Sequence, residues 1–341
     1  MNSRRKFLMT GGILTAGSLL LPLNANTNFH SDQKKIKPKA LKSGDTIAIT
    51  SPAGAVWDAA QIETFSTILK GFGFNVVLGK TLNERSGYFA GSDEFRAKEL
   101  NDLFRDKNIK GIFCMKGGWG CARLLDKLDY KLIQNNPKVL IGFSDITTLL
   151  IAITQKTGLI TFHGPVGNSG WNDFTKNSFT NVVQNNKPYV YPALPSTEEP
   201  IITLSPGKAS GELVGGNLTV ITSIIGSGYL PDWKGKILFL EEFKEEPYSV
   251  DRMLTQLKLS GVFESVSGII FGKCSKCLPE EPLKSFTLQE VLTQHLQSLG
   301  KPVFYGAMIG HIENKLTVPI GIEATMDATT GTISLKENAV S

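Results

Sequence analysis

The sequence is poor in the residues that usually build metal sites. Its 341 residues include only four cysteines and four histidines. Cys274 and Cys277 have the spacing of a metal-ligand or redox pair, but a zinc site needs a second Cys or His pair at suitable spacing, and the sequence offers none. We therefore expect no metal and no cofactor. Two states of the pair stay open, a local disulfide and two free thiols in a loop, while Cys114 is expected in the core.

A strong excess of charge is also lacking. The formal net charge is +5, of which Arg4, Arg5 and Lys6 contribute three, so the rest of the chain carries +2. A nearly neutral body gives no support for nucleic-acid binding. Hydrophobic residues make up 41% and charged residues 20%, which are globular values, and the length suffices for two domains with real cores.

Long hydrophobic runs are absent as well. The apolar stretch 11–23 is short for a membrane span and is interrupted by glycines and Pro22. Because Arg4 and Arg5 precede it, we interpret residues 1–27 as a twin-arginine export signal, the alternative being a membrane anchor. We expect a periplasmic or otherwise exported protein with no stable membrane anchor after processing. Residues 27–39 are predicted to be a polar, disordered lead-in.

Apolar strands and amphipathic helices alternate from residue 46 onward. The strands are predicted at residues 46–50, 75–78, 111–115, 138–142 and 159–162, with helices between them. This alternation predicts a parallel sheet covered on both faces, whose carboxyl edge carries the site. The turns at Ser51, Gly117 and Ser144 should therefore share that edge.

A change in composition divides the chain further on. Residues 166–206 are rich in Asn, Thr, Pro and Ser and are interpreted as a linker with some short helix. The sequence thus predicts an N-terminal nucleophile domain at 40–165 and a smaller C-terminal α/β domain at 207–337, which carries the acid and the base. The fold class is α/β, with a Rossmann-like parallel-sheet domain first.

Ser144 stands where a buried strand turns into a helix. A serine at such a turn projects its hydroxyl out of the sheet, and the backbone N–H of Asp145 then points to where an oxyanion would sit. The alternative is that Ser144 or Asp145 is only the cap of the next helix.

An activated serine needs a base and an acid that orients the base. His163 is expected at the carboxyl end of a strand, and His311 follows Gly310 in a loop. His30 falls in the lead-in, and His295 is expected on a helix surface. Glu241 ends a predicted strand, with an exposed acid as the alternative.

The glycine loop of residues 117–120 opens another helix. It could cradle phosphate, or it could supply an oxyanion-hole N–H beside Ser144. The third glycine of the dinucleotide fingerprint is missing, and so is an acid about 20 residues further on. The oxyanion interpretation is therefore favoured.

Several of these segments together resemble the LD-carboxypeptidase family of serine peptidases, which includes muramoyl-tetrapeptide carboxypeptidases and microcin-C immunity peptidases. The resemblance covers about residues 40–335. It is carried, in order, by Lys116-Gly117-Gly118-Trp119-Gly120-Cys121-Ala122-Arg123-Leu124-Leu125, Ile141-Gly142-Phe143-Ser144-Asp145, Phe162-His163-Gly164-Pro165, Gly215-Gly216-Asn217-Leu218, Leu240-Glu241-Glu242, Pro247-Tyr248-Ser249-Val250-Asp251-Arg252-Met253-Leu254 and Gly310-His311.

The resemblance implies a catalytic triad and a substrate class. Ser144 would be the nucleophile, His311 the general base and Glu241 the acid that orients it. The oxyanion hole would be the backbone N–H groups of Gly118 and Asp145. The expected reaction is release of the terminal D-alanine from murein tetrapeptides through an acyl-enzyme, by an enzyme that is often a homodimer.

Other points stay open from the sequence. We expect Arg252 and Asn217 to bind the muropeptide substrate, with Arg123 a further candidate for its carboxylate. The alternative functions are an amidase that cleaves peptidyl-nucleotide antibiotics and a non-catalytic periplasmic binding protein. The third residue of the stem peptide, the choice between wall and recycled fragments, and the oligomeric state are not fixed by the sequence.

Overall fold

The computed structural model describes residues 34–192, 194 and 198–341. The predicted export signal and His30 lie outside the described residues. Residues 34–39, predicted as part of a disordered lead-in, instead contact the folded chain. Ile36 forms a parallel bridge with Leu159, and its backbone N–H donates to the Gly158 carbonyl at 2.8 Å. The apolar Ile36 side chain packs on the core, a contact that the polar average composition of the segment concealed.

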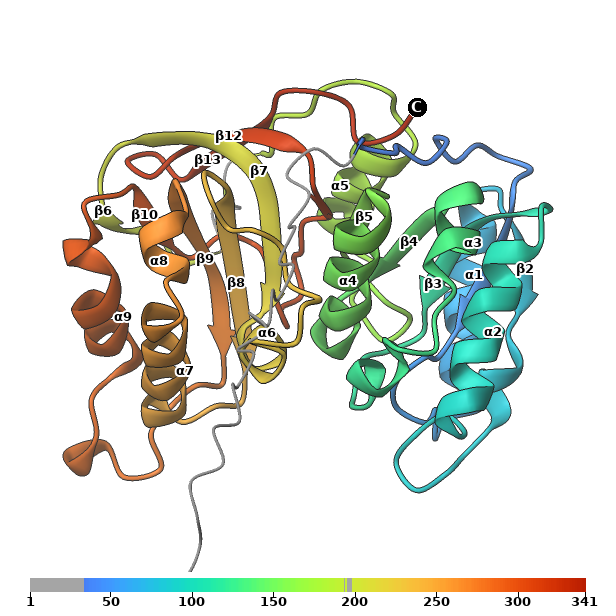
Figure 1. Cartoon of the computed structure of the whole chain (residues 1–341), viewed down its shortest axis with the longest axis horizontal. Coiled ribbons are helices and arrows are strands. Elements are labelled where there is room, and N and C mark those ends of the chain that lie inside the picture. The colour runs from blue at the N-terminus through green and yellow to red at the C-terminus, as the bar shows by residue number, and fades with distance from the viewer. Residues whose placement is uncertain (1–33, 193, 195–197) are drawn as a thin grey trace, which may run out of the picture. The chain divides into compact units, whose positions relative to one another are not determined.

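The strands of the described residues form two sheets, and the helices lie in layers against these sheets (Figure 1). The strands are β1 (Thr46–Thr50), β2 (Asn75–Leu78), β3 (Ile109–Cys114), β4 (Val139–Gly142), β5 (Thr161–His163), β6 (Ile202–Ser205), β7 (Lys208–Asn217), β8 (Ile237–Phe243), β9 (Gly268–Ser275), β10 (Val303–Tyr305), β11 (Val318–Ile320), β12 (Glu323–Asp327) and β13 (Thr332–Leu335). The α-helices are α1 (Ala59–Gly71), α2 (Asp93–Arg105), α3 (Tyr130–Asn135), α4 (Thr147–Thr157), α5 (Asp173–Val183), α6 (Leu218–Ser223), α7 (Pro247–Leu259), α8 (Val262–Ser265) and α9 (Leu288–Leu296).

The first sheet has the order β11-β5-β4-β3-β1-β2. Its strands β1 to β5 pair in parallel, and β11 joins β5 antiparallel. The central strand β4 is buried along its whole length, as expected for a strand covered by helices on both faces. This confirms the predicted parallel sheet.

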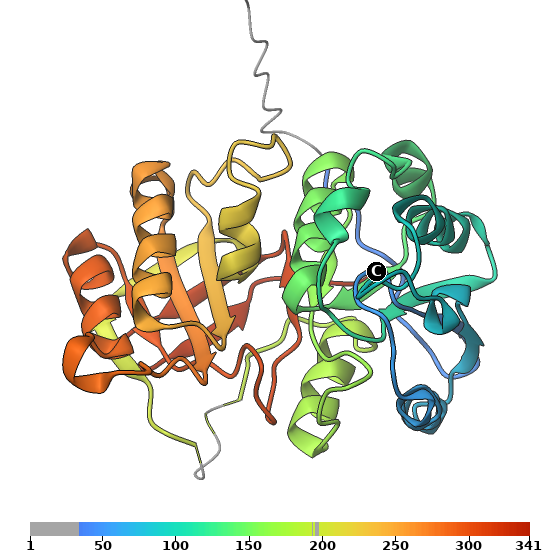
Figure 2. The ribbon, with the colours of Figure 1, turned by 90° about the horizontal axis from the view of Figure 1, so that it is seen from below.

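The second sheet has the order β13-β12-β7-β8-β9-β10-β6. Its centre, β7 to β10, is parallel, while β12, β13 and β6 add antiparallel edges. Figures 1 and 2 show α7 lying along the face of β8 and β9, and the α7 residues Val250, Leu254 and Leu257 are buried. The α/β fold class predicted from the sequence is therefore present in both parts.

The segment predicted as a linker, residues 166–206, contains a helix, α5, and a strand, β6. Its helix α5 is capped by Asn172, whose side chain accepts the Thr175 N–H, and Phe179 of this helix is fully buried. Further along, β6 pairs with β10. The domain limits at 40–165, 166–206 and 207–337 stay a prediction, since residues 32–341 cluster as one compact unit.

Contacts between the two sheets bring the predicted site residues together. The side chain of Thr147, at the start of α4, accepts the backbone N–H of Asn217 at the end of β7, 3.1 Å away. A Cβ on Gly216 would lie 2.5 Å from the Thr147 side chain, so this close approach requires glycine. In Figures 1 and 2, α4 lies between the strands of the two sheets.

Candidate active site

Ser144 lies in a strained turn directly after β4. Its φ is +62°, a left-handed conformation that is uncommon for a residue other than glycine. It begins a short 3-10 helix (Ser144–Ile146) that continues into α4. A Cβ on Gly142 would lie 2.7 Å from the Ile146 side chain, so the turn closes tightly only with glycine there. Such a strained strand-to-helix turn is the geometry that exposes a nucleophilic serine.

The glycine loop packs directly on this turn. A Cβ on Gly117 would lie 2.7 Å from Ser144 Cβ, 2.9 Å from its Oγ and 3.3 Å from the Asp145 nitrogen. The next residue, Gly118, packs on Gly54, since a Cβ on Gly118 would lie 3.0 Å from the Gly54 Cα. The Ser51, Gly117 and Ser144 turns therefore share one sheet edge, as predicted. The oxyanion roles of Gly118 and Asp145 stay a prediction that these contacts favour.

The ion pair of the buried Arg96 with Asp93 supports the glycine loop. Arg96 is fully buried, and its Nη1 donates to the carbonyls of Pro52 (2.5 Å) and Gly120 (3.2 Å), while Asp93 balances its charge. The helix predicted after the loop is only a short 3-10 turn, Cys121–Leu124. Its first N–H, of Cys121, donates to the buried Asp145 side chain at 2.9 Å. The Asp145 side chain thus ties the loop to the serine turn.

Beside the second sheet, the half-buried His311 is hydrogen-bonded to the buried Glu241 of β8. His311 Nδ1 lies 2.8 Å from Glu241 Oε2, and the Glu241 side chain has no exposed surface. An exposed acid at this position is therefore excluded. Gly310 allows the approach, since its φ is +131° and a Cβ there would lie 3.1 Å from Glu241 Oε2. Burial alone would raise the pKa of Glu241, but the hydrogen bond and charge of His311 outweigh it and lower the pKa.

Two phenylalanines fix the His311 ring and link it to the serine turn. The Phe243 ring stacks on it at 4.6 Å and 12°, and the Phe143 ring meets it edge-on at 4.7 Å. Phe143 directly precedes Ser144, and Phe243 lies two residues after Glu241. Nucleophile, base and acid candidates therefore gather around one aromatic cluster.

His163, the other histidine predicted near this edge, is buried beside the pair. Its ring packs against Phe143 and Phe239, with centroids 5.9 Å and 5.4 Å away. Burial lowers the pKa of His163 to about 4, so it is neutral at pH 7. Two polar atoms here are buried without a hydrogen-bond partner among the described residues: Nδ1 of His163 and Oε1 of Glu241. A neutral, enclosed imidazole suits a supporting position better than the role of exposed base.

Lys315 is a site residue that the sequence analysis missed. Its ammonium lies 4.4 Å above the Phe143 ring and donates to Ser169 Oγ at 3.2 Å. Only 5% of the residue is exposed, and burial lowers the pKa of Lys315 to about 8. No motif marks this lysine. The one available signal was its position four residues after His311.

Glu242 and Asn217 form a second buried network. Glu242 accepts the Asn217 Nδ2, the Phe243 N–H, and both the N–H and the hydroxyl of Thr219. Asn217 Oδ1 accepts the Val220 N–H and so caps α6. The substrate-binding role predicted for Asn217 stays a prediction beside this structural one.

The basic candidates from the sequence lie elsewhere. Arg123 Nε donates to Asp93 at 2.8 Å, and its side chain is 58% exposed. Arg252, on α7, is exposed with its guanidinium 5.4 Å from the centre of the Tyr248 ring, and its substrate role stays a prediction. His295 was expected on the surface, but its side chain is only 13% exposed because it bonds Asp251 across α7 and α9 at 2.6 Å.

The residues that the structure describes lack two further features. None of their His, Cys, Asp and Glu side chains form a group of three or more that could hold a metal. No helix within 34–192, 194 and 198–341 is long and apolar enough to cross a membrane.

Comparison with known proteins identifies the family. Residues 47–164 match the LD-carboxypeptidase N-terminal domain, and residues 210–326 match its C-terminal domain. A probable murein peptide carboxypeptidase of Bacillus subtilis is 41% identical over 85% of this chain and 91% of its own length. The microcin C7 self-immunity protein MccF of Escherichia coli is 33% identical over 88% of this chain and 96% of its own.

Solved structures agree with this. The structure of MccF with aspartyl sulfamoyl adenosine has a TM-score of 0.82 at 32% identity, covering 90% of this chain and all of that one. The muramoyltetrapeptide carboxypeptidase of Oxalobacter formigenes has a TM-score of 0.74 at 28% identity, covering 85% of this chain and 97% of that one. The chain therefore belongs to the LD-carboxypeptidase family.

Proposed function

We propose that this protein is a serine LD-carboxypeptidase that releases the C-terminal D-alanine from murein tetrapeptides. The observation that carries the proposal is the buried Glu241–His311 pair, which shares an aromatic contact with the strained Ser144 turn. Nucleophile, base and orienting acid are the parts that acyl transfer requires. The murein peptide carboxypeptidase among the relatives supports the substrate class.

The proposed reaction has two halves. Ser144 Oγ attacks the carbonyl carbon of the terminal amide, and His311 takes the hydroxyl proton. His311 then gives that proton to the amine of D-alanine, which leaves as the C–N bond breaks. A water molecule, deprotonated by His311, hydrolyses the resulting ester and restores Ser144. The N–H groups of Gly118 and Asp145 would stabilise the oxyanion in both halves.

Lys315 is the residue we assign to the free carboxylate of the substrate. Its ammonium lies against Phe143, the neighbour of the proposed nucleophile, and the residue is buried. A buried cation of this kind favours a carboxylate and disfavours an amide, which would leave the charge unpaired. The enzyme should therefore require a free terminal carboxylate.

Product analysis with three defined peptides tests the proposal. We expect D-alanine and tripeptide from L-Ala-D-Glu-(diamino acid)-D-Ala, and no product from its C-terminal amide. The D-Ala-D-Ala pentapeptide should be left intact, since its last bond has a D centre on the acyl side. Inverting that centre spoils the approach of Ser144 to the carbonyl. Removal of one D-alanine from the pentapeptide would contradict the LD specificity.

A second candidate function is cleavage of peptidyl-nucleotide antibiotics. The likeness to MccF, whose structure was solved with aspartyl sulfamoyl adenosine, favours it. Aspartyl sulfamoyl adenosine and murein tetrapeptide should be compared at equal concentrations. A higher kcat/KM for the nucleotide compound would favour this candidate over the first.

The export signal gives the proposed location. We propose that the protein is exported in folded form by the twin-arginine route, because Arg4 and Arg5 precede a short apolar run. Changing both to Lys should retain the protein in the cytoplasm, as measured by cell fractionation. An unchanged periplasmic level would contradict the proposal.

A further inference from the structure

Two thiols lie at the end of β9, where Cys274 pairs in register with Glu242 of β8. Cys274 lies within this strand, not in a loop as the sequence suggested, and Cys277 follows one turn later. Lys276, between them, has a φ of +60° in that turn. A four-residue turn keeps its end Cα atoms within about 7 Å, a range that overlaps that of disulfides. Both cysteines are free and buried, and the Cys277 thiol donates to the Ser275 carbonyl at 3.8 Å.

The two thiols differ in character. The neighbouring Cys274 thiol lowers the pKa of Cys277, against the effect of burial, and the Glu245 N–H adds to the lowering. The same contact, together with burial, raises the pKa of Cys274 well above its usual range. Cys277 is therefore the better thiolate and Cys274 the thiol that would react second.

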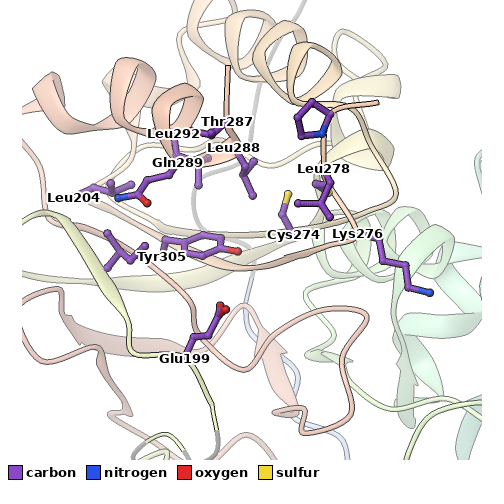
Figure 3. Close-up of a pocket in the computed structure, with 13 residues that line it drawn as sticks. Glu199, Leu204, Cys274, Lys276, Leu278, Thr287, Leu288, Gln289, Leu292 and Tyr305 are labelled. Atoms are coloured by element: carbon purple, nitrogen blue, oxygen red, sulfur yellow. The ribbon is translucent and has the colours of Figure 1, made fainter. Parts of the chain in front are cut away.

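A cavity adjoins both cysteines. It has a volume of about 510 Å³ and is lined by both cysteines together with Leu278, Leu288 and Tyr305. Figure 3 shows the Cys274 sulfur projecting into it, near Leu278 and Leu288. Sites for small ligands have volumes of about 300 to 1,000 Å³, so a small organic disulfide can fit.

The remaining cysteines lack these features. Cys114 and Cys121 are fully buried in the first sheet's core, where burial raises the pKa of each. The carboxylate of Asp145 further opposes a thiolate at Cys121. They serve as internal controls for reactivity.

We propose that Cys274 and Cys277 form a redox-active dithiol, which closes to a disulfide by exchange with a small disulfide that enters the cavity. With cystine, the Cys277 thiolate attacks one cystine sulfur, and one cysteine leaves and takes up a proton. Cys274 then loses its proton and attacks the Cys277 sulfur, releasing the second cysteine. Two electrons pass from the two thiols to cystine, which is reduced to two cysteines.

Peptide mapping of the folded, full chain tests this directly. The protein is incubated with cystine, its remaining thiols are alkylated in denaturant, and it is digested with trypsin without reduction. Trypsin cuts after Lys273, Lys276 and Lys284. A disulfide therefore holds peptides 274–276 and 277–284 together. We expect the joined peptide after cystine treatment and its loss on reduction, with Cys114 and Cys121 alkylated throughout. Two separate, alkylated peptides after cystine treatment would overturn the proposal.

Single variants test the order of attack. Cys274→Ser should accumulate a mixed disulfide of Cys277 with cysteine, whereas Cys277→Ser should react at least roughly tenfold more slowly at Cys274, since exchange follows the thiolate fraction. Equal rates would overturn the assignment of Cys277 as the attacking thiol. The wild-type peptide map decides the disulfide itself even where a variant does not fold.

Discussion

The two sides of the proposed active site are held by different means. On the first sheet, Ser144 is positioned by backbone contacts, with Gly117 against its side chain and Gly142 under its turn. Beside the second sheet, Glu241 and His311 are positioned by the hydrogen bond between their side chains and by flanking rings. The first side should therefore be sensitive to added bulk, and the second to changes in charge or hydrogen bonding.

Removing either reacting side chain should have the largest effect. Ser144→Ala or His311→Ala should lower kcat by roughly 10⁴-fold or more, because the members of a triad act as a unit. Ser260→Ala and His295→Ala are matched controls, since Ser260 is exposed after the end of α7 and His295, on α9, also bonds a carboxylate. Steady-state kinetics on the tetrapeptide measure the effect. Comparable losses in the controls would contradict a specific role.

Added bulk on the backbone-held side should be nearly as damaging. Gly117→Ala places a Cβ 2.7 Å from Ser144 Cβ and must displace the turn or the loop. A displaced oxyanion donor costs about 10²- to 10³-fold in kcat. Gly71→Ala is the control, because the added Cβ would meet no atom within 4 Å. An active Gly117→Ala enzyme would show that the loop does not position the serine.

Substitutions of the adjacent acids Glu241 and Glu242 should have different effects: one should lower activity and the other should lower stability. Glu241→Gln should lower kcat, though by less than Ser144→Ala or His311→Ala, because an amide cannot orient the imidazole as the carboxylate does. Glu242→Gln should leave kcat within a few-fold but destabilise the fold by about 1–3 kcal/mol, since buried donors on Asn217 and Thr219 lose a charged acceptor. Turnover and thermal melting are measured on both. The reverse pattern would exchange their roles.

Lys315 should give the smallest effect and a pH signature. Lys315→Met should raise KM roughly tenfold with kcat little changed, if the lysine holds the substrate carboxylate. In the wild type, kcat/KM should fall above pH 8, where Lys315, with its pKa of about 8, loses its proton. The variant should lack this fall. An unchanged KM would indicate that Arg252 or Arg123, and not Lys315, binds the substrate carboxylate.

The same lysine makes a stability prediction. Its pKa is lowered from 10.5 to about 8 in the folded chain, so between these values the unfolded chain binds more protons. The stability of the wild type relative to Lys315→Met should then rise with pH across that window. Melting temperatures at pH 7.5 and 9.5, which we choose to bracket about pH 8, measure the difference. If the stability of the wild type relative to the variant fell between these pH values, the lowered pKa of Lys315 would be contradicted.

The contrast between the two sides also explains what the sequence could predict. Buried parallel strands appear as apolar runs, and close backbone approaches require glycine, so β4, the Ser144 turn and the loop at Gly117 were predictable. Burial of a polar side chain depends on segments far away in the chain. Arg96 meets the glycine loop, and Lys315 meets Phe143, through contacts that leave no local pattern.

Composition also misled where tertiary contacts decide. The polar composition of segment 166–206 predicted some short helix but not the strand β6, in which only Leu204 is buried. The single apolar Ile36 anchors a segment that average polarity marks as disordered. The His295–Asp251 pair joins two helices 44 residues apart, a distance over which single-sequence patterns carry no information.

Labelling with a fluorophosphonate probe tests the central claim most directly, namely that Ser144 is activated by His311 from the other sheet. The wild-type protein should become labelled on the peptide that contains Ser144, and both Ser144→Ala and His311→Ala should lose the label while retaining the wild-type melting temperature. An unlabelled wild-type protein, or a label on another serine, would contradict the account.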